Sequence, residues 1–133
     1  MDKDLELNIC RVFFDKRCRE RLYYELSSDK KRRCFFDRMS HTADDYLSDC
    51  IAKRFPKPPC TDDISSFLGD REGYIIALNS VYDGKTADIP QAAEELWCCG
   101  EPYMIVNRDC TAAYLETEYD FSVHTAFFLR CNK

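Results

Sequence analysis

The hydrophobic pattern changes about halfway along the chain, and this change most constrains the fold. In the first half, apolar residues recur every four positions on one helical face: Phe14, Cys18, Leu22 and Leu26. In the second half, short β-rich segments such as 73–79 stand between turn residues. This order predicts an α+β fold, with a helical N-terminal half packed on a C-terminal sheet.

Capping residues and helix breakers divide the first half into separate helices. Ser27, Ser28 and Asp29 are favourable N-cap types, so they are expected to end one helix and begin the next. Thr42 begins a further helix that Pro56 ends. Residues 5–13 also alternate like a strand, but their helical neighbours favour a helix. The predicted helices cover residues 5–13, 14–26, 30–39, 42–55 and 61–68.

The second half predicts four strands. A helix over 91–97 separates the first strand from the second, which is typical of a parallel crossover, whereas the later connections are short and predict antiparallel pairing. We therefore expect a single domain over 1–133, with a helical part over about 1–69 and a mixed, four-stranded sheet over about 73–131. The predicted strands are 73–79, 103–106, 112–118 and 124–130.

Targeting signals and cysteine usage indicate the compartment. No apolar run approaches the roughly 20 residues of a membrane helix, and the start MDKDLELN lacks the basic and apolar regions of a signal peptide. The nine cysteines are odd in number and irregularly spaced. They are therefore interpreted as reduced, mostly buried thiols. The sequence predicts a cytoplasmic protein with no membrane partner.

Metal-ligand spacing is absent from the sequence. A zinc site usually requires closely paired Cys or His ligands, and the chain has no CxxC or HxxxH motif. Cys98 and Cys99 are adjacent, but neighbours on a helix point about 100° apart. We interpret both as filling the core between helix and sheet. The sequence predicts no metal and no cofactor.

Only two histidines are available for acid–base chemistry near neutral pH. His41 lies close in sequence to Arg38 and Asp45, and the three could form a small polar site, although a helix junction explains His41 equally simply. His124 begins the last predicted strand, where alternation places it on the opposite face from Cys131. No catalytic motif is present, so an enzyme with a site near His41 is the weakest functional hypothesis.

Charge is distributed unevenly along this acidic chain, whose formal net charge is -5. Residues 11–38 hold ten Lys or Arg against five Asp or Glu, whereas the rest hold nine against nineteen. This polarity favours an oppositely charged partner, and it fits self-association into a homo-oligomer as well.

The basic segment 16–33 has two parts. The cations before Ser27 are scattered around a helix and resemble an ordinary charged surface. Lys30, Lys31, Arg32 and Arg33 instead follow the proposed cap Asp29, where the helix dipole disfavours each cation by about 0.3 to 1 kcal/mol. Three explanations remain: a helix that starts later, internal carboxylates, or a bound anion.

The sequence favours a small, non-catalytic binding or regulatory domain that acts through an acidic protein surface or another polyanion. The alternative is a nucleic-acid-binding protein, because Tyr23 and Tyr24 lie among the cations and could stack on bases. The predicted binding residues are Arg17, Arg21, Tyr24, Lys30, Lys31, Arg32 and Arg33.

Overall fold

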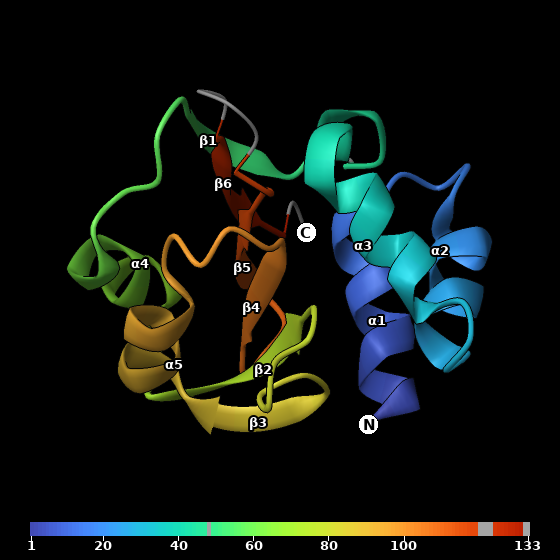
Figure 1. The fold of residues 1–133 in the computed structure, drawn as a ribbon, viewed down its shortest axis with the longest axis horizontal. Helices are drawn as coiled ribbons and strands as arrows, with labels where there is room; N and C mark the ends of the chain where they lie inside the picture. The colour runs from blue at the N-terminus through green and yellow to red at the C-terminus, as the bar shows by residue number, and fades with distance from the viewer. Residues whose placement is uncertain (48, 120–123, 132–133) are drawn as a thin grey trace.

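A computed structural model describes residues 1–47, 49–119 and 124–131. In this part of the chain, a six-stranded sheet forms a central layer between two groups of helices (Figure 1). The prediction of an α+β fold is confirmed. One group consists of α1 (Lys3–Phe13), α2 (Arg19–Ser27) and α3 (Arg32–His41), and the other of α4 (Thr61–Leu68) and α5 (Ile89–Leu96).

The sheet is antiparallel at every pairing between the described strands, in the order β1-β6-β5-β4-β2-β3. The four predicted strands are confirmed as β2, β4, β5 and β6, and the ends of each differ from the prediction by at most two residues. The strands are β1 (Ile51–Phe55), β2 (Glu72–Ala77), β3 (Lys85–Asp88), β4 (Tyr103–Asn107), β5 (Ala112–Glu116) and β6 (Ala126–Arg130).

The central strands alternate their side chains between two hydrophobic cores. On β2, Tyr74 and Ile76 belong to the core beneath α1, α2 and α3, whereas Ile75 and Ala77 belong to the core beneath α4 and α5. A strand that is buried on both faces has a continuous apolar sequence. This explains why 73–79 was recognisable as a strand without any polar alternation.

The predicted helix over 42–55 is wrong. Only a short 3-10 helix, Ala43–Asp45, occurs there, and the chain then forms the edge strand β1. Ile51 pairs with Leu129 of β6, so the partner that makes this segment a strand lies far away in the sequence. The sheet therefore begins in the half that was expected to be helical, and it has six strands rather than four.

The predicted parallel pairing of the first two strands is also wrong. An additional strand, β3, follows β2 and pairs with it antiparallel, and β4 pairs antiparallel with the other edge of β2. Strands β3 and β4 therefore run in the same direction, with β2 between them. The crossover through α5 starts from β3, which was not among the predicted strands.

Two predicted helix starts require correction. The helix over 14–26 begins only at Arg19, because Phe14 is the C-cap of α1. The apolar stripe nevertheless packs in one core, since a turn can bury residues as well as a helix does. Helix α3 begins at Arg32 after Lys31, and no side-chain hydrogen bond caps it, so the proposed cap Asp29 is wrong.

Other local predictions are confirmed. Residues 5–13 are helical within α1, whose N-cap Asp2 accepts a hydrogen bond from the amide of Leu5 at 3.0 Å. Helix α4 ends at Gly69, whose φ of 74° is the left-handed conformation that glycine adopts without steric cost. Among the described helices, none is long and apolar enough to cross a membrane.

No disulfide bond joins the cysteines among the residues that the structure describes, but the expectation that most are buried is wrong. Three are buried and three are intermediate in exposure, so burial does not account for the whole set. The exposed thiols are Cys60, Cys98 and Cys99.

Candidate functional site

Two neighbouring depressions on the outer surface of the three-helix layer have six cations among their thirteen lining residues. They measure about 450 Å³ and 400 Å³, and Arg17 lines both. Glu20 is the only carboxylate among their lining residues. We call this region the basic surface and define it by its six cations: Arg11, Lys16, Arg17, Arg19, Arg21 and Arg38.

The predicted binding residues Arg17 and Arg21 lie on the basic surface with side chains that are 84% and 70% exposed. Arg17 pairs with Asp15 at 3.2 Å and Arg21 with Glu25 at 3.4 Å. The Arg17–Asp15 pair is exposed and contributes less than about 1 kcal/mol, so Arg17 could exchange its carboxylate for another anion. Glu25 is buried, but the exposed guanidinium group of Arg21 could still meet a second anion from solvent.

The other exposed residues of the predicted set lie on α2, on α3 and in the connection between them. Lys30, Lys31 and Arg33 are exposed and form no ion pair with any residue that the structure describes. Tyr24 is 56% exposed on α2. Lys30 precedes α3, whereas Lys31 is its N-cap and Arg33 lies in its first turn, so the expected conflict with the helix dipole is only partly removed.

Arg32 differs from its neighbours because it is buried. Its guanidinium group donates to Glu6 on α1, to Asp83 before β3 and to the carbonyl of Leu26. These five bonds, between 2.7 and 3.2 Å, use every N–H group of the side chain. Desolvation opposes the charged form, but the bonds to Asp83 and Glu6 raise the pKa of Arg32 above its ordinary value. Internal carboxylates therefore neutralise this member of the basic run.

Arg38, His41 and Asp45, the predicted polar site, do not form one cluster in the structure. Arg38 donates to Glu25, with a shortest distance of 2.8 Å, and this bond is the main cause of its raised pKa. His41 is half exposed and lies 3.1 Å from the carboxylate of Glu118. Asp45 is exposed in the 3-10 helix. The two basic residues therefore engage carboxylates from different parts of the chain.

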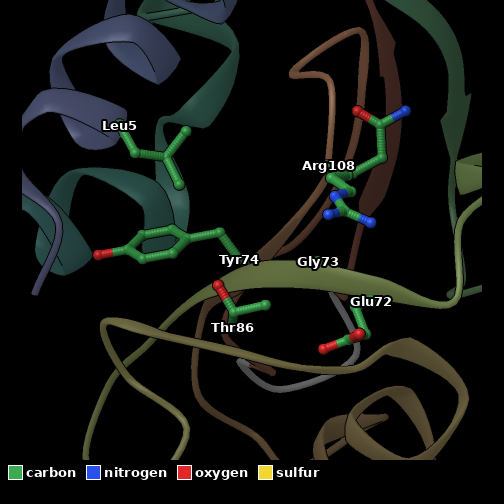
Figure 2. A pocket seen from close by; sticks show the side chains of 7 residues that line it. Leu5, Glu72, Gly73, Tyr74, Thr86 and Arg108 are labelled. Carbon is green, nitrogen blue, oxygen red and sulfur yellow. The ribbon is translucent and has the colours of Figure 1, made fainter.

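A pocket of about 280 Å³ lies between α1, β2, β3 and the turn after β4. Figure 2 shows Leu5 and the ring of Tyr74 on one side, with Glu72 and Arg108 on the other. The Tyr74 hydroxyl points away from the two charged groups and donates to Glu6 at 2.7 Å. Burial, followed by this bond to Glu6, raises the pKa of Tyr74.

The remaining buried polar group of this pocket has a structural role. The Oδ1 atom of Asn107 accepts hydrogen bonds from the amides of Thr111 and Ala112 and so closes the turn between β4 and β5. Its Nδ2 atom donates to the carbonyl of Leu68. We therefore assign no chemistry to this pocket.

A more unusual arrangement surrounds Glu116 at the end of β5. Glu116 is fully buried, and its Oε1 atom accepts hydrogen bonds from Tyr103 at 2.9 Å and Tyr114 at 2.7 Å. Its Oε2 atom lies 2.9 Å from the amide nitrogen of Cys98 and 3.0 Å from Nε2 of His124. One ligand atom each from Cys98, Glu116 and His124 lies within 4.8 Å of the other two. We call these three residues the Cys98 cluster.

Strand geometry explains how the Glu116 carboxylate meets both tyrosines. Tyr114 and Glu116 are two positions apart on β5 and therefore share a face, and Tyr103 is the cross-strand partner of Glu116 on β4. Burial raises the pKa of Glu116, while the hydrogen bonds from Tyr114 and Tyr103 partly oppose that effect. Burial is also the main cause of the raised pKa of each tyrosine.

The backbone places Cys98 at the exposed side of this cluster. Helix α5 ends at Leu96, and Cys98 has a φ of 54°, a left-handed conformation that is uncommon for a residue with a Cβ atom. The interpretation of Cys98 and Cys99 as core residues is wrong, since both are exposed after the helix. Desolvation raises the pKa of the Cys98 thiol, and the negative charge of Glu116 adds to this effect.

Sequence reasoning missed the Cys98 cluster because its members have no motif spacing. Cys98 and Glu116 are separated by a turn and two strands, and His124 precedes β6. The one available signal was Glu116 itself, a carboxylate that directly follows the apolar run 112–115 of the predicted strand 112–118. No protein-family model, curated protein or solved structure matches this chain.

Proposed function

We propose that this protein is a non-catalytic binding domain that recognises an acidic protein partner through the basic surface. The observation that carries this proposal is the lining of the two depressions, which contains six cations and one carboxylate. Such a patch on a chain of net charge -5 favours association in one orientation, because the rest of the molecule repels the same partner.

The arginines suit a carboxylate-rich ligand. Arg17 and Arg21 are both exposed. A carboxylate of the partner protein could displace Asp15 from Arg17, and a second one could bind Arg21 while Glu25 stays in place. A planar guanidinium group binds carboxylates in a bidentate manner, which adds orientation to charge attraction. Lys30, Lys31 and Arg33 are exposed but line neither depression, so they are not part of the basic surface. Arg32 is buried and is left out of the proposed surface.

Nucleic acid binding is the second candidate, and Tyr24 is the observation that favours it. Its exposed ring could stack on a base next to the cations. Tyr23 is only partly exposed and packs against the helical core, so it offers a smaller stacking surface. Single-strand binders usually stack successive bases on several aromatic rings, and we therefore favour the acidic protein.

Two defined polyanions test these candidates. Labelled poly-glutamate represents an acidic polypeptide, and a labelled single-stranded oligonucleotide represents nucleic acid. Fluorescence anisotropy at low and at physiological salt should show that poly-glutamate binds, and that its affinity falls as salt screens the charges. The double variant Arg17→Glu/Arg21→Glu should lose at least about tenfold in affinity, because attraction becomes repulsion.

The matched control is Lys57→Glu/Lys85→Glu, which changes the net charge equally at two exposed positions outside the basic surface. This control should lose less than about threefold, since only long-range and screened repulsion changes. Equal losses in both double variants, or no binding of poly-glutamate, would reject the proposed surface. Tighter binding of the oligonucleotide would establish the nucleic-acid alternative instead.

A further inference from the structure

We infer that the Cys98 cluster is a binding site for a zinc ion, with Cys98, Glu116 and His124 as its three protein ligands. The cluster lies at one end of the sheet, whereas the basic surface lies on the outer helical layer, so this inference is independent of the proposed function.

The spacing of the ligand atoms suits a tetrahedral ion. Zinc bonds to nitrogen and oxygen of about 2.0 to 2.1 Å place two such ligands roughly 3.3 Å apart. The Nε2 atom of His124 and the Oε2 atom of Glu116 are 3.0 Å apart, so a movement of a few tenths of an ångström would admit the ion. The Cys98 thiol, which is exposed, has the freedom to rotate toward it.

Charge provides a separate argument. Glu116 is completely buried, yet no Lys or Arg side chain forms an ion pair with it among the residues that the structure describes. Its one basic neighbour is His124, which carries a charge only when protonated. A buried carboxylate is normally paired with a cation, bound to a metal ion or neutralised by a proton. A divalent ion between Glu116, His124 and Cys98 would balance this charge.

The tyrosines orient the carboxylate for this task. Tyr103 and Tyr114 both donate to Oε1 of Glu116, which leaves Oε2 directed at His124 and at the backbone of Cys98. Fixing one carboxylate oxygen so that the other faces the ion is the usual function of hydrogen-bonding groups around a metal site. The buried tyrosines therefore behave as positioning residues for a ligand, beyond satisfying a buried charge.

The ligand types select the metal. One sulfur, one imidazole nitrogen and one carboxylate oxygen form a mixed donor set that suits zinc, whereas calcium and magnesium prefer oxygen donors throughout. Three protein ligands leave one position of a tetrahedral ion for water or for a group from another molecule. On binding, Cys98 loses its thiol proton to solvent and His124 coordinates as a neutral imidazole.

The arrangement is less suited to a cysteine nucleophile. A catalytic Cys–His–carboxylate set uses both nitrogens of the imidazole ring, one toward the thiol and one toward the carboxylate. Here the Nε2 atom of His124 faces Glu116, and Cys98 also approaches the same carboxylate through its own amide. The ligand atoms of Cys98, Glu116 and His124 lie within 4.8 Å of one another, an arrangement that suits a shared ion better than a catalytic chain of hydrogen bonds.

Cobalt and zinc titrations of the reduced, chelator-treated full-length protein test the inference. Cobalt should bind with one equivalent and show the visible bands of a tetrahedral ion together with a thiolate-to-cobalt band, and zinc should displace it. Cys98→Ser should abolish the thiolate band and weaken zinc binding by more than about tenfold. Because Cys98 is exposed, this substitution should leave the circular dichroism spectrum unchanged.

The chain has eight other thiols that could bind metal by chance, and Cys99→Ser is the matched control for such binding. Its sulfur atom donates to the carbonyl of Glu101 at 3.5 Å, and it is outside the cluster, so cobalt spectra and zinc affinity should stay within about twofold of the wild type. His124→Gln should also weaken zinc binding, whereas His41→Gln should not. Failure of the wild type to bind one zinc ion, or unchanged binding in folded Cys98→Ser, would overturn the inference.

Discussion

Glu6 and Glu116 are both completely buried glutamates, and both accept hydrogen bonds from tyrosine hydroxyls, but they differ in how their charge is balanced. Glu6 faces Arg32, which bridges it to Asp83. Glu116 has His124 as its one basic partner among the described residues. The comparison separates a network that is complete within the protein from one whose charge balance could include a ligand.

The Arg32 network joins three parts of the fold. Its members come from α1, α3 and the connection between β2 and β3, and Tyr74 links it to the sheet. Such a network stabilises the packing of the helical layer on the sheet as long as every member is present. The Cys98 cluster instead reaches the surface at an exposed cysteine, where an ion could enter.

Removing the arginine from the complete network should have the largest effect. Arg32→Met leaves Glu6 and Asp83 without their cation and should lower the free energy of unfolding by about 3 to 5 kcal/mol. Urea unfolding at neutral pH measures this change. The adjacent exposed position provides the control, because Lys31→Met should stay within about 0.5 kcal/mol. A loss below about 1 kcal/mol in Arg32→Met would show that the network is not stabilising as a unit.

Zinc should stabilise the folded protein through the Cys98 cluster, without any contribution from the Arg32 network. At a free concentration of 100 times its dissociation constant, one ion that binds only the folded state adds about 2.7 kcal/mol. Thermal unfolding should therefore shift upward with zinc in the wild type and in Lys31→Met, but not in Cys98→Ser. An equal shift in all three proteins would mean that the ion binds outside the Cys98 cluster.

Loss of one tyrosine hydroxyl beside Glu116 should have a smaller effect. Tyr114→Phe removes a 2.7 Å hydrogen bond to a buried carboxylate, and bonds to charged groups contribute about 1.5 to 3 kcal/mol. Chelator-containing urea unfolding measures the loss without any metal contribution. Tyr24→Phe, at an exposed position, should change stability by less than about 0.5 kcal/mol. Indistinguishable results for the two variants would remove the case for Tyr114 as a positioning residue.

The partly exposed carboxylate of Asp88 completes the comparison and should show the smallest effect. The amide of Gln91 lowers the pKa of Asp88, the N-cap of α5, and Arg71 contributes further. Its stabilising contribution is therefore present above the unfolded pKa of about 3.9 and disappears as the pH falls through the lower folded value.

Asp88→Asn should consequently be less stable than the wild type at pH 7, and the two proteins should converge in acid. Urea unfolding across this pH range measures the difference between them. Glu95→Gln, at an exposed position on α5, controls for the general loss of one negative charge. A difference that grows in acid would contradict the sign of the pKa change.

Part of the fold was predictable because its signals are local. The apolar runs of β2 and β4 identify strands buried on both faces, and Gly69 ends α4 as its position predicts. Strand β1 was not predictable, since its only pairing partner is β6 and its own exposed residues suit an edge strand as well as a helix. Because β3 was not predicted, β2 and β4 were wrongly expected to be parallel.

The candidate sites show the same division. Arg17 and Arg21 were identified from charge density, and the structure places both on the basic surface. The burial of Arg32 could not be predicted, because its partners Glu6 and Asp83 lie 26 and 51 residues away in the sequence. The Cys98 cluster likewise required β4 and β5 to pair before its members could meet.

By itself, the sequence determined the four strands β2, β4, β5 and β6 of the second half and where the chain's positive charge is concentrated. Both properties depend on neighbours within a few positions, which set backbone periodicity and local charge. Tertiary structure alone decided which cation is buried, which remain exposed, and which carboxylate meets a thiol and an imidazole. These outcomes require atoms from distant segments to approach within about 3 to 5 Å, a condition that only the packed sheet and its two helical layers create.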